Sequence, residues 1–499
     1  MMFSRVKDEL MRRFSLATPE RNDESFHRKM PIAGLQSLTA LPNGRENTAD
    51  AVRKKSRALP EEESLYDEAA LRKVLAKDTV ELDELCSTCR SGCPATFRRE
   101  VWGYLTGNLQ PFLSSRATVL ARKRQEYVGY VQSSYSSIDW DAALRAVETG
   151  GTACVNLAPA EIKDGDDDTF VGACATSSVR QRQVVGGAQY GIASESELRM
   201  LKQIRKDVPR MSAGVAYLHH KRVMLSIERI LYIWALRHPA CGYVQGINDL
   251  LIPFISVVLS SQFCSSKTVA ELHSLTAREL DELFSTDAVS EEEWMCTIEA
   301  DTYWMASHLL SGMQENYTYN QRGIYSMVRH LEAVTRVVNV KLYKHLIEEL
   351  QIDFNQFAFR WMNCLLLREL NATQSLRLWD TYLADVERDW CTTHVYVCAA
   401  LLIWFSPVLC NERDYGVVMK FLQNLPTEEL SAQDFNALIS QGVMMQKLYN
   451  NALRHLFVEG GWLLFFFFFS FLWAVMDESI PAQLARNTQT HNNNNNNEK

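Results

Sequence analysis

Apolar residues recur at the three- and four-residue spacing of a helix face from about residue 80 onward, and this periodicity most constrains the fold. Few stretches alternate polar and apolar residues with a period of two, as half-buried strands do. Pro94, Pro209 and Pro407 fall near the ends of periodic stretches, where proline is tolerated or ends a helix. The sequence therefore predicts an all-α fold. The expected helices cover residues 96–105, 118–130, 197–206, 223–237, 248–258, 298–310, 323–349, 354–369, 376–382, 392–405 and 415–422.

Two segments interrupt this pattern. Residues 139–196 are rich in Gly, Ala, Ser and Thr, and we interpret them as an internal loop insertion. Their acidic run at 164–168 resembles a calcium loop, but Thr169 stands where the sixth position requires Gly and Ala175 where the twelfth requires Glu. Residues 260–292 form a shorter insertion that is expected to hold one small helix.

Both ends of the chain differ in composition from the periodic part. Residues 1–79 are polar and include a basic run at 53–57, which predicts a mostly disordered arm. Ser15, which follows two arginines, matches a basophilic kinase site, although a solvated tail explains that short pattern as well. Charges throughout the first fourteen residues exclude a secretory signal of the usual kind.

The apolar segment 462–476 contains Ser470 as its one polar residue and precedes a polar, Asn-rich tail. As a helix it would span about 22 Å, which is shorter than the roughly 30 Å hydrocarbon core of a bilayer. Basic Lys447 and Arg454 precede it and acidic Asp477 and Glu478 follow it, a bias that fits a tail anchor on a cytosolic domain. A membrane contact, packing onto the helical domain and an exposed extension all remain open for residues 456–499.

Charge and cysteine usage limit the class of protein. The net charge of −8 over 499 residues gives no electrostatic reason to expect a nucleic-acid partner. The twelve cysteines are scattered, and several lie inside apolar stretches, as Cys364 and Cys398 do, which is typical of reduced core thiols in a cytosolic protein.

Common catalytic motifs are absent from the sequence. It contains no phosphate-binding GxxxxGK[ST], no HExxH and no GxSxG, so a P-loop NTPase, a zincin and an α/β-hydrolase are not expected. Cys86, Cys89 and Cys93 have metal-like spacing, but no fourth Cys or His follows nearby. We therefore expect no metal site and interpret the three as partly buried thiols.

One stretch of the chain carries polar residues at two successive helix ends. Residues 204–210 (IRKDVPR) end a predicted helix, and residues 243–246 (YVQG) form a turn after the next helix, which Pro239 and Gly242 terminate. This places Arg210 and Gln245 on loops. From these residues alone the arrangement is compatible with a site but is equally compatible with ordinary surface residues.

Motifs in a fixed order carry a resemblance to a known family. IRKDVPR resembles the IxxDxxR motif of TBC domains, and YVQG resembles their YxQG motif. The segment 92–102, with a GxP turn followed by RxxxW, is similar to the first TBC motif. The segments IEADTYW (298–304), FAFRWMNCLLLREL (357–370) and RLWDTYL (377–383) follow in the family's order. The resemblance covers about residues 80–455 and is nearest to the member 22 subgroup, through RHPACGYVQGINDL-like and FLQNLP-like segments.

The resemblance implies a V-shaped helical domain that stimulates GTP hydrolysis by Rab GTPases in their GTP-bound form. Arg210 would be the arginine finger, because a guanidinium is always charged and presents a planar fork of donors to the transferring phosphate. Gln245 would hold the attacking water, because its amide both accepts and donates hydrogen bonds. Such a protein has no cofactor of its own and acts on the GTP and Mg²⁺ that the Rab binds. Its expected location is the cytoplasm, peripheral to Golgi or endosomal membranes.

Further residues of these motifs are expected to support the two catalytic loops. Asp207 is predicted to pair with a basic residue and orient the Arg210 loop, while Tyr243 and Gly246 shape the Gln245 turn. The remaining supporting residues are Ile204, Arg98 and Trp102, and the last two are expected to anchor the first helices.

The sequence also bears on two alternatives to a catalytic role, a silent scaffold and an integral membrane protein. Met211 replaces the Thr that many TBC domains have after the finger, a minor departure that the member 22 subgroup shares. The alternative class is a catalytically silent Rab-binding scaffold or membrane-tethered adaptor, and the presence of both finger residues weighs against it. An integral membrane protein with its helices in lipid is excluded, because apolar runs before the tail, such as 395–405, are too short to span a bilayer.

Overall fold

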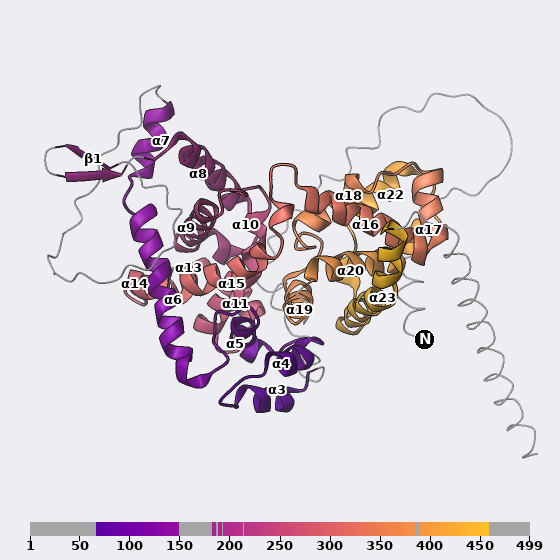
Figure 1. The fold of residues 1–499 in the computed structure, drawn as a ribbon, viewed down its shortest axis with the longest axis horizontal. Helices are drawn as coiled ribbons and strands as arrows, with labels where there is room; N and C mark the ends of the chain where they lie inside the picture. The colour runs from indigo at the N-terminus through magenta and orange to yellow at the C-terminus, as the bar shows by residue number, and fades with distance from the viewer. Residues whose placement is uncertain are drawn as a thin grey trace, which may run out of the picture.

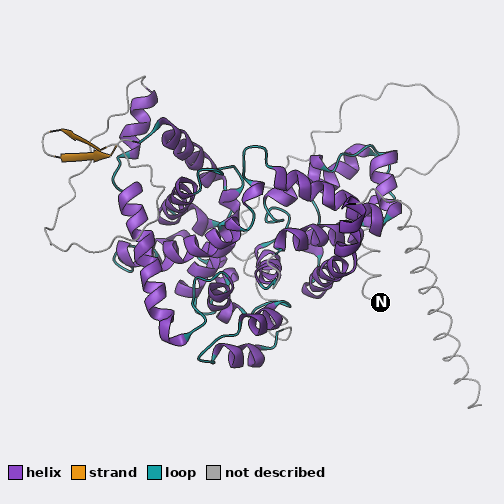
Figure 2. Ribbon diagram, in the orientation of Figure 1, coloured by secondary structure: helices purple, strands orange, loops and turns teal. Residues whose placement is uncertain are grey.

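The computed structural model describes residues 66–148, 182–185, 188–191, 193–212, 214–385 and 389–458. Within these residues the chain is almost entirely helical, which confirms the predicted all-α class (Figure 2). Several segments named above lie outside the described residues: residues 1–65, which include Ser15, the acidic run 164–168 and the apolar segment 462–476. Among the helices that are described, none is both long and apolar enough to cross a membrane.

Figure 1 shows the helices gathered into two lobes, the two-armed arrangement that the resemblance implies. The first lobe runs from α3 to α15 and the second from α16 to α23. The helices of the first lobe are α3 (Glu68–Leu75), α4 (Leu82–Cys89), α5 (Ala95–Leu105), α6 (Leu113–Ser134), α7 (Trp140–Glu148), α8 (Glu195–Asp207), α9 (Lys221–Arg237), α10 (Ile247–Leu250), α11 (Ile252–Phe263), α12 (Val269–Ser274), α13 (Ala277–Leu283), α14 (Glu291–Trp294) and α15 (Ala300–Ser311).

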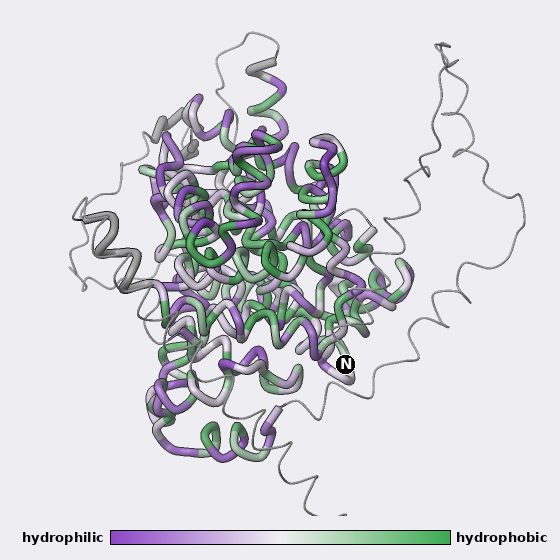
Figure 3. Tube along the Cα trace, turned by 90° about the vertical axis from the view of Figure 1, so that its right-hand side faces the viewer, coloured by the Kyte–Doolittle hydropathy of each residue, from purple (hydrophilic) through white to green (hydrophobic). Residues whose placement is uncertain are grey.

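The second lobe is built around α20, which packs against α16 and α23. Most of its residues are apolar and buried, as expected of a helix that neighbours surround. The helices of this lobe are α16 (Arg322–Val338), α17 (Val340–Lys344), α18 (Asn355–Asn363), α19 (Ala372–Leu383), α20 (Trp390–Trp404), α21 (Ser406–Leu409), α22 (Tyr415–Gln423) and α23 (Ala432–Val458). Along the tube in Figure 3, many of the hydrophobic stretches run through the interior of the packed helices.

Helix α19 joins the lobes, because it contacts α4, α5, α11 and α12 of the first lobe. At this contact the buried carboxylate of Asp380 accepts hydrogen bonds from Arg98 Nε at 3.1 Å and Nη2 at 3.0 Å. It also accepts from Trp102 Nε1 at 2.8 Å and from the Cys93 backbone N–H at 3.0 Å. Burial by itself would lower the pKa of Arg98, but the charge of Asp380 and the hydrogen bonds to it together raise that pKa. A buried charge satisfied in this way is costly to break.

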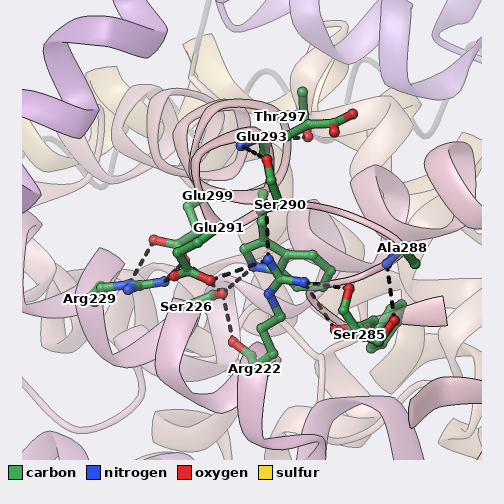
Figure 4. A network of polar contacts seen from close by, with 12 residues as sticks. Arg222, Ser226, Arg229, Ser285, Ala288, Ser290, Glu291, Glu293, Thr297 and Glu299 are labelled. Carbon is green, nitrogen blue, oxygen red and sulfur yellow. Dashed lines mark hydrogen bonds and ion pairs between the residues drawn. The ribbon is translucent and has the colours of Figure 1, made fainter. Parts of the chain in front are cut away.

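A second buried ion pair holds α9 against the π-helical turn η4 (Met295–Glu299) (Figure 4). Glu299 is fully buried and pairs with Arg229, while Ser226 and Tyr127 donate their hydroxyls to it at 2.9 and 3.0 Å. Arg229 also pairs with Glu291 at 2.8 Å. Since every partner lies on a packed helix, we assign this network to the assembly of the first lobe.

Two predicted helices are shorter than their periodicity indicates. The helix expected over 323–349 ends at Val338, where Asn339 turns out of the helix and its side chain caps α17. The helix expected over 354–369 ends at Asn363, because Leu365 and Leu366 adopt left-handed backbone angles with φ of 48° and 61°. In both cases the apolar spacing continues past the break, so periodicity alone does not reveal it.

The predicted domain boundaries also need correction. Residues 68–75 of the supposed arm form α3, whose Leu71 and Val74 are buried in the core. Residues 140–148 of the supposed loop insertion form α7, and Trp140 packs edge-on against Tyr232 of α9. This short helix packs its apolar face on the lobe, and the Gly-rich composition of the rest of the insertion does not indicate it.

The insertion and the chain end show two further differences from prediction. A short antiparallel hairpin pairs β1 (Arg182–Val185) with β2 (Ala188–Gly191), a local exception to the helical fold. The last helix, α23, extends to Val458, three residues beyond the predicted end of the domain.

Candidate functional site

Arg210 lies on a short 3₁₀ turn, η2 (Val208–Arg210), directly after α8. Ser194 and Glu197 form a capping box at the start of α8, and Ile204 is fully buried near its end. Buried Val208 and Met211 hold the turn from both sides, so Arg210 points outward between two fixed residues. Within the described part of the chain the Arg210 guanidinium forms no hydrogen bond or ion pair and is exposed. It is therefore free to meet an anionic partner.

Gln245 lies on the turn between α9 and α10, and its side chain is exposed. Gly246 follows it with a φ of 109°, a conformation that residues with a Cβ rarely adopt. A Cβ at this position would lie 2.2 Å from Nδ2 of Asn363, so glycine is also required by space. The same Nδ2 atom donates a hydrogen bond to the backbone carbonyl of Gln245 at 3.2 Å.

Asp207 and Tyr243 connect the two loops directly. The Tyr243 hydroxyl donates to Oδ2 of Asp207 at 3.0 Å, and Gln203 Nε2 donates to the same oxygen at 2.9 Å. The expectation of a basic partner for Asp207 is wrong within the described residues: Oδ2 accepts from these two neutral donors, and the buried Oδ1 atom has no hydrogen-bond partner there. Burial and the neighbouring Asp207 charge raise the pKa of Tyr243, which keeps its hydroxyl protonated. The side chain of Asn248 lies 3.2 Å from that hydroxyl and accepts the Gly246 N–H at 3.0 Å.

Sequence reasoning missed a second layer of residues beneath the Gln245 turn. Buried Asp249 accepts hydrogen bonds from Asn248 Nδ2 at 3.1 Å, Arg368 Nε at 2.7 Å and Cys364 Sγ at 3.5 Å. Burial by itself would lower the pKa of Arg368, but the charge of Asp249 raises it. The segment 357–370, which resembles one of the family's motifs, contains Asn363, Cys364 and Arg368. That motif was the sequence signal that could have indicated these residues.

A cavity of about 330 Å³ opens beside the finger candidate. Its lining combines the end of the Arg210 loop, the start of α11 and the segment after α18. The residues that line it are Arg210, Ser212, Asp249, Ile252, Leu367 and Arg368. The Arg210 loop therefore lies next to the layer that supports the Gln245 turn, although the two loops are separated in sequence.

The other predicted supporting residues lie elsewhere. The hydrogen bonds of Arg98 and Trp102 go to Asp380 and Cys93 at the α5–α19 contact and not to either loop. Both side chains anchor α5 to α19, as expected for residues that anchor the first helices, and neither donates one of these hydrogen bonds to the two loops. In the described residues, no group of three His, Cys, Asp or Glu side chains is placed to hold a metal ion.

Comparisons with known proteins identify the family of this chain. The family model described as "Rab-GTPase-TBC domain" matches residues 176–410. The chain is 32% identical to human TBC1 domain family member 22A over 428 residues, which cover 85% of this chain and 69% of that protein. It is 34% identical to the GTPase-activating protein gyp1 of Schizosaccharomyces pombe over 384 residues, 77% of this chain and 62% of that protein.

A solved structure has the same fold. The crystal structure of the Ypt/Rab-GAP domain of Gyp1p is similar with a TM-score of 0.60 at 28% identity, and the match covers 76% of this chain and 98% of that domain. Together with the ordered motifs and the helical architecture, these likenesses lead to one conclusion. The chain belongs to the family of proteins that contain a Rab-GTPase-TBC domain.

Proposed function

We propose that this protein stimulates GTP hydrolysis by a Rab GTPase, with Arg210 and Gln245 supplied in trans. The observation that carries the proposal is the pair of exposed polar side chains on loops that Asp207 and Tyr243 tie together. Family membership supports the Rab as the partner, since the relatives are named as GTPase-activating proteins or TBC1 family members.

The chemistry of γ-phosphate hydrolysis explains why these two residue types are present. Charge accumulates on the oxygens of the transferring phosphoryl group, and an unpaired guanidinium such as that of Arg210 stabilises it in a bidentate manner. An arginine finger contributes about 10³–10⁵ in rate, or roughly 4–7 kcal/mol of barrier. Gln245 replaces the water-orienting glutamine of the GTPase, because its amide contacts the water and the phosphate together. The Rab brings the GTP and Mg²⁺, and this chain contributes no cofactor.

A panel of Rab proteins loaded with GTP tests the proposal. The wild-type chain is expected to accelerate phosphate release from at least one of them, and Arg210→Lys to lower that rate at least a hundredfold, because an ammonium cannot reproduce the planar fork. Arg199→Lys is the matched control, since Arg199 is an exposed arginine on α8, the helix that precedes the Arg210 turn. Near-normal activity of Arg210→Lys would reject the finger assignment. Binding of a Rab without any stimulation would favour the catalytically silent scaffold.

Membrane attachment through residues 462–476 is part of the same proposal, because a Rab GTPase-activating protein meets its substrate at a membrane. The charge distribution on the two sides of this segment supports it. A fusion of residues 450–499 to a soluble fluorescent protein is expected to sediment with membranes after carbonate washing and to mark Golgi or endosomal membranes. A diffuse cytoplasmic signal would end this part of the proposal.

A further inference from the structure

Asn363 contacts the Gln245 turn from the opposite lobe. It is the last residue of α18, and its Nδ2 atom donates to the Gln245 carbonyl across 118 positions of sequence. The orientation of the amide is chemically determined, since Oδ1 in that place would face another acceptor. The side chain also fills the space beneath Gly246, where a Cβ would lie 2.2 Å from Nδ2. The peptide that follows the Gln245 side chain is thus held both by contact and by hydrogen bonding.

Asn363 is itself firmly placed. Its backbone carbonyl accepts a hydrogen bond at 3.0 Å from the hydroxyl of Tyr317, a fully buried residue. Immediately afterwards, Leu365 and Leu366 adopt left-handed angles while their side chains are buried in the core. Such angles cost about 1–3 kcal/mol per residue outside glycine and persist where the surrounding packing imposes them. Backbone strain of this kind concentrates at functional sites.

The strained bend serves the turn that carries Gln245. It ends α18 at Asn363 and turns the chain so that Cys364 and Arg368 both reach Asp249, three residues after Gly246. A straight helix through 363–368 would place residues 363 and 368 about 140° apart around its axis. The bend therefore directs three side chains of the second lobe toward one turn of the first.

We propose that Asn363 is a positioning residue for Gln245: its amide fixes the Gln245 peptide and thereby the direction of the water-orienting side chain. This inference rests on the proposed function of Gln245. Asn363 acts on the orientation of a group within the complex and not on the docking of the GTPase. Its loss should therefore lower kcat and leave KM for the Rab unchanged, since misplacement of a reacting group by about 1 Å costs up to a hundredfold in rate.

A double-mutant cycle on stimulated Rab hydrolysis tests the inference. Asn363→Asp keeps the size of the side chain and removes the donor, and it is expected to lower kcat about 10- to 100-fold with KM within about twofold. In a Gln245→Ala background the same substitution should cause no further loss, because the group it positions is gone. Asn355→Asp on the same helix is the matched control, since Asn355 is exposed and its side-chain amide donates to the neighbouring Asp353.

The outcomes separate this inference from the proposed function. Unchanged kcat in Asn363→Asp, or an equal loss with and without Gln245, overturns the positioning role. Either result leaves the proposed roles of Arg210 and Gln245 intact. A Gln245→Ala variant as fast as wild type, or a wild type without stimulation, overturns the proposed function and the inference with it. If thermal unfolding shows that Asn363→Asp does not fold, Asn363→Ala carries the same cycle, because it also removes the donor and introduces no charge.

Discussion

The hydroxyl of Tyr243 lies 3.0 Å from Oδ2 of Asp207, so the loop that carries Gln245 is bonded to the loop that carries Arg210. Asp207 is buried and Tyr243 is partly buried, so this hydrogen bond to a charged acceptor is stronger than one on the surface. The two candidate catalytic side chains are exposed, but the residues beneath them form one connected polar layer. Removing a member of that layer should affect both loops together.

Tyr243→Phe is the simplest test of this connection. The variant leaves the buried Asp207 carboxylate with one donor fewer, which should cost about 1–3 kcal/mol of unfolding free energy. Stimulated hydrolysis should fall about tenfold, because the separation of the two loops is no longer held. Tyr415→Phe is the control, since its hydroxyl bonds to exposed Gln356 and neither residue belongs to the two loops. Equal activity and stability of both variants would contradict a structural connection between the loops.

The role of Gln245 can be separated from that of the GTPase's own glutamine. Gln245→Ala should impair hydrolysis on a Rab whose glutamine is intact, because the water loses its orienting group. The wild-type chain should still act, at least in part, on a Rab in which that glutamine is changed to Leu. Complete resistance of the altered Rab would mean that hydrolysis depends on the ordinary glutamine of the GTPase.

The Asp380 contact should dominate the association of the two lobes. Asp380→Asn removes the charge that pairs with Arg98 and leaves a buried guanidinium without its counterion. Breaking a buried pair in this way costs about 3–5 kcal/mol, which denaturant unfolding followed by circular dichroism will measure. Asp287→Asn, at an exposed position, is the control and should leave the unfolding midpoint unchanged. A loss below about 1 kcal/mol would show that packing alone joins the lobes.

Deletions in the insertion should differ sharply according to where they begin. Replacement of residues 150–181 by a short Gly-Ser linker is expected to keep solubility and most activity, as the composition of this stretch predicts. Deletion of residues 142–194 removes most of α7, which packs against α8 with Ala143 buried, and it also removes Ser194, which caps α8. We expect that variant to aggregate or unfold at lower temperature. Equal stability of both deletions would mean that α7 contributes nothing to the lobe.

Periodicity predicted most of the helices because the spacing of apolar residues in an amphipathic stretch indicates which face of the helix is buried. The predictions over 223–237 and 392–405 lie within two residues of α9 and α20 at each end. The prediction failed where packing imposes a break on a periodic stretch, as at Asn339 and at Leu365–Leu366. It also failed for α3 and α7, helices of 8 and 9 residues that are too short to be stable without packing on the lobe.

The sequence by itself determined the all-α class, the family resemblance and the two residues proposed for catalysis, because each of these follows from patterns within short stretches of the chain. Only the tertiary structure decided what holds those residues. Asp207 meets Tyr243 across 36 positions, and Gln245 meets Asn363 across 118. No local pattern specifies which donor satisfies a buried acceptor so far along the chain. That choice follows from how the helices of the two lobes pack, which brings distant polar groups together once the apolar faces are buried.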